Sequence, residues 1–240
     1  MGFSLIQTCP ATKARAGELV TPHGRVATPI FLPVGSQGTV KTLTPEELES
    51  IGVTMLLANA YHLYLRPGIE VIEKMGGLHQ FMAWHGPILT DSGGYQIFSL
   101  ASLRQLSEEG VKFRSHIDGS EHFFTPEFVI QLQERLGSDI IMPLDVCPSY
   151  SHDLAEIQDA MERTHRWAAR CLKNHKRHDQ SLYGIVQGGI FPELRRESAR
   201  FLASLGFPGY SIGGLSLGEP KDLTKSMLEE TLPLISAEKP

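Results

Sequence analysis

The chain has 240 residues, of which 41% are hydrophobic and 20% are charged, and its formal net charge is −5. This is the composition of a globular protein with enough apolar residues to bury a core. The net charge gives no sign of a nucleic-acid partner, although a local basic patch would suffice to bind one.

The three cysteines, Cys9, Cys147 and Cys171, are far apart in the sequence. Their odd number and wide spacing indicate neither a disulfide framework nor a zinc knuckle. The first residues lack the basic segment and long apolar run of a signal peptide, and no apolar stretch approaches the length of a membrane span. The sequence therefore predicts a protein of the reducing cytoplasm without a membrane partner.

Residues 1–30 contain short β-like segments and predict an antiparallel apron. After them, apolar runs typical of buried strands alternate with helical segments. Strands are expected at 31–34, 53–58, 88–91, 139–144, 181–186 and 209–212. Helices are expected at about 44–50, 69–75, 125–136, 154–175 and 193–205, with another from about 221. The pair Asp118-Gly119 predicts a hairpin inserted after the third of these strands.

This alternation predicts an α/β protein with a parallel sheet. Six βα units with polar, glycine-rich strand ends look like most of a (β/α)₈ TIM-type barrel, which typically has about 250 residues. The alternative is an open, doubly wound sheet. We favour the barrel and expect residues 1–240 to be a single incomplete domain, an N-terminal portion with the apron at 1–30 and units one to six at 31–240.

Polar residues follow four of the expected strands: Asp91, Asp145, Gln187 and the pair Gly213-Gly214. Active sites of barrels lie at the carboxyl ends of the strands, so these residues are expected to converge on one mouth. For Asp91 alone, the competing interpretation is a cap of the following helix, since Asp and Ser are common N-cap residues.

Two carboxylates, an amide and free backbone N–H groups suit a flat ligand that carries donors and acceptors on one edge. Guanine offers N1–H and N2–H beside the acceptor O6. A carboxylate such as Asp145 can accept from both donors, and Gln187 or a glycine N–H can donate to O6. The ring of Tyr95 can stack on the base, which is worth about 1–3 kcal/mol in comparable sites. An aldolase or lyase barrel would also place carboxylates here.

Four segments then occur together in one order: NAYHLYLRPG at 59–68, LTDSGGYQIFSL at 89–100, IVQGG at 185–189 and GGLSLGE at 213–219. Together they closely resemble the tRNA-guanine transglycosylases, from about Phe3 to the end of the chain. The resemblance implies a (β/α)₈ barrel that exchanges the wobble guanine of the tRNA anticodon loop for a 7-deazaguanine in queuosine biosynthesis. Tyr95 resembles the bacterial branch, whose incoming base is 7-aminomethyl-7-deazaguanine.

The resemblance also implies roles for individual residues. Asp91 would be the catalytic general acid/base, and Asp145 would bind the N1/N2 edge of the base. Gln187 and the Gly214 N–H would bind O6, and the Leu215 carbonyl would lie near the 7-substituent. The base pocket would be lined by Ser92, Gly93, Gly94, Tyr95 and Cys147.

The chain departs from the family pattern in several places. Val146 stands where bacterial members often have Glu, and Leu217 where Val is usual, which leaves the base preference open. No residue here matches the family's nucleophilic Asp or its zinc-binding Cys/Cys/Cys/His set, and Asp153 and Asp159 lack the motif context to replace them. We expect zinc and a homodimer in the full-length family, no metal ligands within 1–240, and no base exchange by this chain alone. A non-catalytic guanine- or tRNA-binding subunit of the same family is the alternative function.

Two clusters carry weaker expectations. His165, His175 and His178 have no spacing typical of a metal site. Basic residues recur at helical steps and predict a solvated outer helix face rather than a phosphate-binding stripe; they are Arg163, Arg166, Arg170, Lys173 and Arg177.

Overall fold

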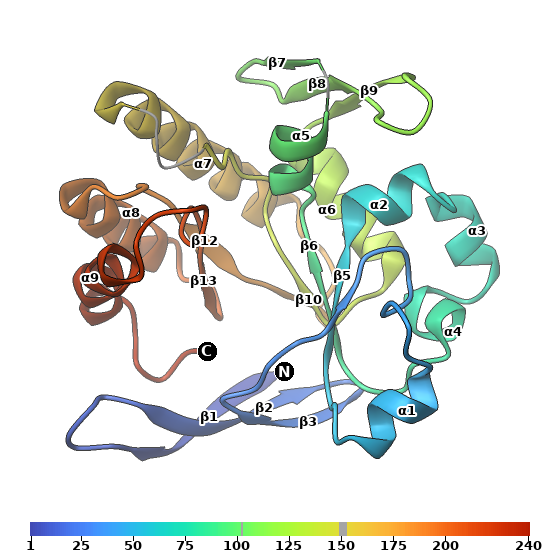
Figure 1. Cartoon of the computed structure of the whole chain (residues 1–240), viewed down its shortest axis with the longest axis horizontal. Helices are drawn as coiled ribbons and strands as arrows, with labels where there is room; N and C mark the ends of the chain where they lie inside the picture. Colours follow the sequence, from blue (N-terminus) through green and yellow to red (C-terminus); the bar gives the residue numbers. More distant parts are fainter. Residues whose placement is uncertain (102, 149–152) are drawn as a thin grey trace.

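The computed structural model describes residues 1–101, 103–148 and 153–240. A curved layer of parallel strands has helices on its outer side (Figure 1). The parallel strands are β4 (Val34–Gly35), β5 (Leu56–Asn59), β6 (Ile88–Asp91), β10 (Ile140–Ile141), β11 (Ser181–Leu182), β12 (Gly184–Val186) and β13 (Tyr210–Ile212). The helices are α1 (Pro45–Ser50), α2 (Ala60–Leu65), α3 (Ile69–Lys74), α4 (Leu78–Met82), α5 (Gly94–Leu100), α6 (Pro126–Leu136), α7 (Leu154–Asn174), α8 (Pro192–Leu205), α9 (Lys221–Thr231) and the 3₁₀ turn η1 (Leu232–Leu234).

The parallel sheet runs in the order β11-β10-β6-β5-β4, and β12 pairs with β13 beside it. One expected strand, 181–186, is divided between the two sheets. The N–H of Tyr183 donates to the carbonyl of Ile141 at 3.0 Å, whereas the residues after Tyr183 pair with β13. The α/β architecture with a parallel sheet is therefore confirmed. Among the described parallel strands, β4, β11, β12 and β13 each have a partner strand on one side only, and the full (β/α)₈ barrel stays a prediction.

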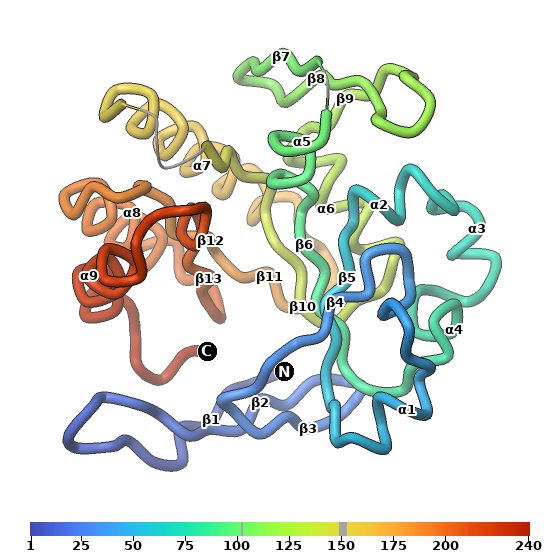
Figure 2. The backbone as a smooth tube through the Cα atoms, in the orientation of Figure 1, coloured from blue at the N-terminus to red at the C-terminus, as the bar shows by residue number. Residues whose placement is uncertain are grey.

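An antiparallel sheet at the N-terminus lies at the amino ends of the parallel strands, below them in Figure 1, and is made of β1 (Gly2–Thr8), β2 (Arg15–Thr21) and β3 (Gly24–Thr28). Leu19 and Val26 of this sheet pack in one buried cluster with Ile140 and Ile185 of the parallel strands. The last residues of the chain return to the same sheet, where Arg15 donates to the carbonyl of Lys239 at 3.1 Å (Figure 2). The N-terminal sheet therefore lies against the body of the domain.

The outer face of the parallel sheet packs against the helices through a large apolar cluster that includes Ile88, Leu132, Leu144 and Trp167. The helices that the sequence predicts begin and end close to their expected bounds, whereas α2, α4 and α5 are additional. For α6, Thr125 accepts from the N–H of Phe128 at 3.1 Å as the N-cap, and Gly137 ends the helix at φ 79°. Helix packing thus fixes the strands whose carboxyl ends form the site.

The segment after α5 forms a three-stranded antiparallel sheet of β7 (Arg104–Leu106), β8 (Val111–Arg114) and β9 (Glu121–Phe124). The pairing of β8 with β9 is the hairpin expected around Asp118-Gly119, and β7 is an additional strand. Phe113 and Phe124 pack edge to face, with ring centroids 5.1 Å apart, and Phe124 also contacts Tyr64 of α2. The inserted sheet is therefore held to the domain by aromatic contacts.

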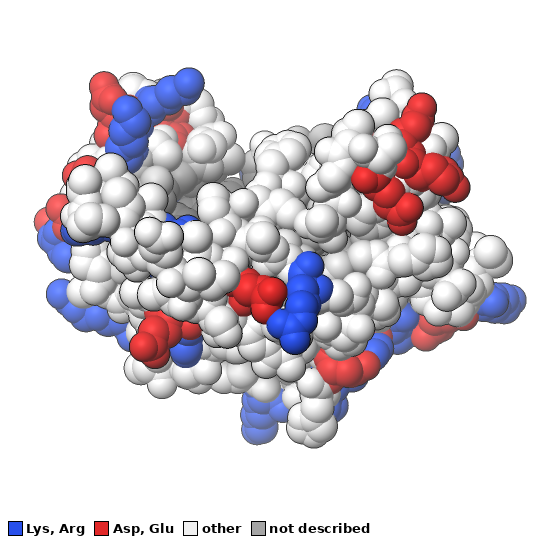
Figure 3. All heavy atoms as spheres, turned by 90° about the horizontal axis from the view of Figure 1, so that it is seen from below, with Lys and Arg blue, Asp and Glu red and all other residues white. Residues whose placement is uncertain are grey.

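The basic stripe of α7 is not a simple solvated face. Arg166 and Arg170 form bidentate pairs with Glu108 and Glu127, and Arg163 pairs with Asp159. The pairs of Arg166 and Arg170 join α7 to the inserted sheet and to α6, whereas the pair of Arg163 with Asp159 lies within α7. On the face seen in Figure 3, acidic and basic side chains are interspersed. No helix in the described ranges is both long and apolar enough to cross a membrane.

Candidate active site

Asp91 is the last residue of β6 and lies opposite Asn59, the last residue of β5. Its carboxylate accepts from the Asn59 amide, from Gln96 Nε2 at 2.9 Å, and from the N–H groups of Ala60 and Gly93 at 3.0 and 3.2 Å. The following helix is capped by Gly93, which adopts φ 81°, and not by the Asp91 side chain. The interpretation of Asp91 as a cap of that helix is therefore wrong.

Asp145 follows β10 and is buried next to the turn after β6. Ser92 Oγ donates to Asp145 Oδ1 at 3.3 Å, and Gln187 Nε2 donates to Asp145 Oδ2 at 2.7 Å. Gly94 passes so close that a Cβ on it would lie 2.4 Å from Asp145 Oδ1. Glycine is required at position 94 because the Asp145 carboxylate occupies the space of a side chain.

Both carboxyl groups have perturbed protonation equilibria. Burial raises the pKa of Asp145 to about 6, and the charge of Asp91 adds to the effect, while hydrogen bonds from Gln187 and Ser92 oppose it. Burial also raises the pKa of Asp91, against the four hydrogen bonds that it accepts. Two carboxyl groups that share a site in this way are typical of acid/base or ligand-binding centres.

Gln187 follows β12, and its backbone N–H donates to Ser198 Oγ at 3.1 Å. Its side-chain amide is packed against the glycine pair after β13. A Cβ on Gly213 would lie 2.6 Å from Gln187 Nε2, and one on Gly214 would lie 2.4 Å from Oε1. The structure therefore brings Asp145, Gln187 and Gly214 together, with the Gln187 amide donor directed at Asp145.

A cavity of about 410 Å³ is lined by Tyr95, Val146, Cys147 and Leu217, among others. Of the predicted site residues, Tyr95 and Cys147 line it, whereas Asp91, Asp145, Gln187 and Gly214 do not. Tyr95 is 51% exposed, so its side chain is accessible to a ligand. Burial, with the nearby charge of Asp145, raises the pKa of the Cys147 thiol to about 12, which keeps it protonated. Leu215 is half-buried in the loop after β13 and is not among the residues that line this cavity.

Arg195 of α8 is a site residue that the sequence reasoning missed. Its guanidinium is fully buried and donates to carbonyl oxygens of both glycine turns, those of Val186, Gly189, Gly213 and Gly214. Burial lowers its pKa to about 10. The signal lay in the helix pattern, because the buried face of α8 reads Arg195, Ser198, Ala199 and Leu202. A positive charge on the buried face of a helix requires buried hydrogen-bond acceptors, so it predicts contacts of this kind.

The loop after β13 is fixed from its other side by Glu219. This carboxylate accepts from the N–H groups of Ser216 and Leu217 and from Thr224 Oγ1. Burial opposes ionisation of Glu219, but these hydrogen bonds outweigh it and hold the pKa at about 2. Arg195 and Glu219 together determine where the Gly214 backbone lies relative to Gln187.

The described residues offer little for the zinc set of the resembled family. Cys9, Cys147 and Cys171 are separate free thiols, so they do not fit a Cys/Cys/Cys/His site. His165 bonds to Ser198 and stacks on a phenylalanine ring instead of joining other histidines. Asp153 is the N-cap of α7. One group with ligand spacing does occur in the described part of the chain, at the opposite end of the sheet: His23, His79 and Asp139.

Comparison with known proteins identifies the family of this chain. The sequence profile of the family described as Queuine tRNA-ribosyltransferase matches residues 9–240. A protein of that name from Dehalococcoides mccartyi is 60% identical over 238 residues, which are 99% of this chain and 61% of the relative. Those from Pelotomaculum thermopropionicum and Halothermothrix orenii are 59% and 55% identical over all 240 residues, which are 65% and 64% of their lengths. The chain spans less than two thirds of these relatives, and it belongs to the queuine tRNA-ribosyltransferase family.

Proposed function

We propose that this chain carries the base-binding pocket and the acid/base group of a tRNA-guanine transglycosylase. The reaction would exchange the wobble guanine of tRNA for 7-aminomethyl-7-deazaguanine. The observation that carries the proposal is the pair of carboxyl groups at neighbouring strand ends, Asp91 and Asp145, connected through the Asp-Ser-Gly-Gly turn. Family membership and the names of the relatives support the same reaction.

Asp145 is the proposed reader of the base. Its two oxygens accept from Ser92 and Gln187, and guanine would present N1–H and N2–H to the same carboxylate. A base that supplies these donors releases the Gln187 amide, which then donates to O6 together with the Gly214 N–H. The Leu215 carbonyl would meet the 7-substituent, and Tyr95 would stack on the ring from the open side of the cavity.

Asp91 is the proposed general acid/base. Four donors hold its carboxylate in one orientation, so a proton can be exchanged with the base at a fixed position. Its pKa, raised by burial, favours a group that can hold a proton during turnover. We assign no residue of this chain to the nucleophile or to the zinc ligands of the family.

The partners follow from the reaction. A transglycosylase of this family would bind the anticodon loop of tRNA and a free 7-deazaguanine base, and act as a homodimer in the cytoplasm. The closed barrel and the single-domain organisation of residues 1–240 belong to the same proposal.

The decisive experiment is guanine exchange into tRNA by the full-length protein. Asp145→Asn keeps the size but turns one acceptor into a donor that faces a base N–H. We expect at least about a hundredfold loss, the equivalent of two steps of 1.36 kcal/mol. A xanthine-type base, which replaces one of the two donors by an acceptor, should lose less or gain. Asp91→Asn should lower turnover more than base binding.

Asp222→Asn is the matched control, because the Asp222 side chain is 97% exposed on α9, and circular dichroism tests the folding of each variant. Near-normal guanine exchange and selectivity in Asp145→Asn would show that another group reads the base. Base binding without exchange by the unaltered protein would favour the non-catalytic subunit instead.

A further inference from the structure

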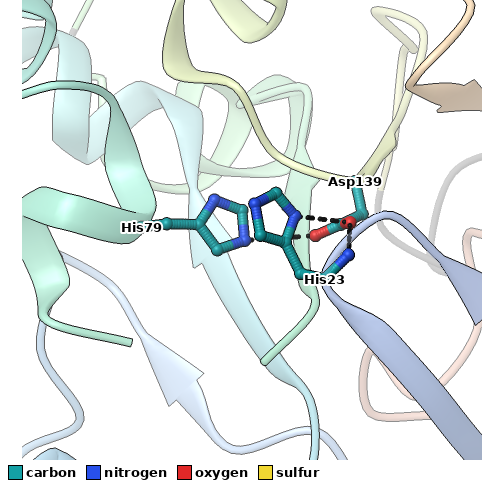
Figure 4. Close-up of side chains that lie close together, drawn as sticks. All are labelled: His23, His79 and Asp139. Atoms are coloured by element: carbon teal, nitrogen blue, oxygen red, sulfur yellow. Dashed lines mark hydrogen bonds and ion pairs between the residues drawn. The ribbon is translucent and has the colours of Figure 1, made fainter. Parts of the chain in front are cut away.

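Three potential metal ligands meet at the amino ends of the parallel strands, the end opposite Asp91 and Asp145. His23 lies in the turn between β2 and β3, His79 lies on α4, and Asp139 immediately precedes β10. His23 Nδ1 is 2.9 Å from Asp139 Oδ1, and His79 Nε2 is 3.2 Å from Asp139 Oδ2 (Figure 4). One ligand atom of each residue lies within 4.8 Å of those of the other two. This group is called the His-His-Asp cluster below.

The carboxylate of Asp139 is the anchor of the cluster. Its side chain is 0% exposed, and it also accepts from the N–H groups of Ile88 and His23, at 2.9 and 3.4 Å. Within the described ranges, the ion pairs of Asp139 go to the two histidines and to no lysine or arginine. A metal ion bound by the two imidazoles would supply, next to this buried carboxylate, the positive charge that no lysine or arginine of the described ranges supplies.

We propose that His23, His79 and Asp139 bind a divalent first-row transition metal, with Zn²⁺ as the best-matched ion. Two imidazole nitrogens and one carboxylate oxygen are the ligand types that zinc takes in proteins. The His23 side chain is 39% exposed while that of His79 is 11% exposed, so solvent reaches the cluster from the His23 side. A water molecule would complete a four-coordinate site from that direction.

The imidazoles must move apart for the ion to enter. Their rings are stacked with centroids 3.5 Å apart and an angle of 15° between the planes. Metal–nitrogen bonds of roughly 2.0–2.1 Å direct two bound rings away from each other, which opens this stack. His23 can accommodate the change because it lies in the short, partly exposed turn between Thr21 and Gly24. The Ile88 N–H meanwhile keeps the carboxylate oriented.

Metal binding would connect three parts of the fold. The metal would join the N-terminal sheet, through His23, to α4 and to the start of β10. This site has no residue in common with the base pocket, so its failure would leave the proposed exchange reaction untouched.

The experiment measures binding of ZnCl₂ and CoCl₂ to the metal-free 240-residue chain by calorimetry and visible absorption. All proteins carry Cys9→Ser, because Cys9 is a half-exposed thiol that could bind the probe by itself. We expect one bound ion per chain and a Co²⁺ spectrum of nitrogen and oxygen ligation. His79→Gln and Asp139→Asn should weaken the affinity at least tenfold, and His85→Gln, which changes an exposed histidine outside the cluster, should not.

Asp139→Asn removes a buried carboxylate that accepts from the Ile88 N–H, so a loss of binding in this variant has to be separated from a folding defect. His23→Gln alters the partly exposed turn and provides the second test. Loss of the Co²⁺ spectrum in folded His23→Gln would support the site. Equal affinities in the native, His23→Gln and His79→Gln chains, or the absence of 1:1 binding, would overturn it and leave a hydrogen-bonded cluster.

Discussion

Asp139 and Asp145 lie on one short segment, at the two ends of the strand region around β10, yet their protonation equilibria are shifted in opposite directions. Burial raises the pKa of Asp145 to about 6. Burial acts on Asp139 as well, but hydrogen bonds from His79, Ile88 and His23 outweigh it and lower the pKa to about 2. Burial alone therefore does not decide the charge of a carboxyl group in this sheet.

The difference lies in the donors. Asp139 accepts from two imidazoles and two backbone N–H groups. Asp145 accepts one amide at 2.7 Å and one hydroxyl at 3.3 Å, and it faces the second carboxyl group, Asp91. A carboxyl group at the base of the sheet is satisfied by the fold, whereas the one at the mouth retains acceptor capacity for a ligand.

The largest expected effect, on guanine affinity, comes from displacing the Asp145 carboxylate, which accepts fewer hydrogen bonds than that of Asp139. Gly94→Ala would place a Cβ 2.4 Å from Asp145 Oδ1 and 2.7 Å from its backbone oxygen, so Asp145 must shift. Alanine favours the helix that begins there, so the fold should survive. We expect guanine affinity, measured by calorimetry, to fall about a hundredfold. Gly2→Ala is the control, since a Cβ at Gly2 meets nothing within 4 Å; an unchanged affinity in Gly94→Ala would place the base elsewhere.

The Asp139 carboxylate, which accepts four hydrogen bonds, should contribute to the free energy of unfolding. Because the native pKa of Asp139 is about 2, against an ordinary value of 3.8, its ionised form stabilises the fold by roughly 2 kcal/mol. This stabilisation is present above pH 3.8 and is lost as the pH falls towards 2. Asp139→Asn should therefore lower the free energy of unfolding by about that amount at pH 7, with a chelator present. Denaturant unfolding that shows no more loss than in Asp222→Asn would contradict the assignment.

The pH dependence of base binding tests the Asp145 side of the comparison. In the proposed pocket, guanine binds the ionised Asp145 carboxylate, which is depleted below pH 6. Affinity should be nearly constant above pH 7 and fall about tenfold between pH 7 and pH 5. Asp145→Asn should bind weakly and without this dependence. A native profile that is flat down to pH 5 would mean that Asp145 has an ordinary pKa.

Much of the fold and of the candidate site could be predicted from the sequence. Apolar runs followed by Asp91, Asp145 and Gln187 place polar groups at parallel strand ends, and that rule is general. The short helices α2, α4 and α5 lack a long enough periodic pattern to be predicted. Strand 181–186 was expected to be continuous, and its division at Tyr183 depends on the partners on either side.

Some contacts between segments that are distant in the sequence could not be predicted from it. His23, His79 and Asp139 are separated by more than fifty residues at each step, so no ligand spacing exists in the sequence. Arg195 reaches two glycine turns that only the packed sheet brings together. Such sites are defined by tertiary structure, although a charge on the apolar face of a helix, as at Arg195, is a usable signal.

The smallest expected effect has the opposite sign to that of Asp139. The native pKa of Asp145 is about 6, whereas the ordinary value is 3.8. Between pH 3.8 and pH 6, the carboxyl group is therefore protonated in the native state but ionised in the unfolded state. Stability is therefore lost as the pH rises from 3.8 to 6 and stays lower above it. Asp145→Asn removes this cost, while its amide can still pair with Ser92 and with Gln187 after the latter rotates. We expect Asp145→Asn to be about 1 kcal/mol more stable at pH 7.5, a Tm increase of roughly 2–4 °C, and the gain to vanish near pH 4. Thermal unfolding of both proteins across this range is the measurement. A variant that is less stable than the native chain at pH 7.5 would show that Asp145 is satisfied by the fold in the way that Asp139 is, and the contrast between the two ends of the sheet would fail.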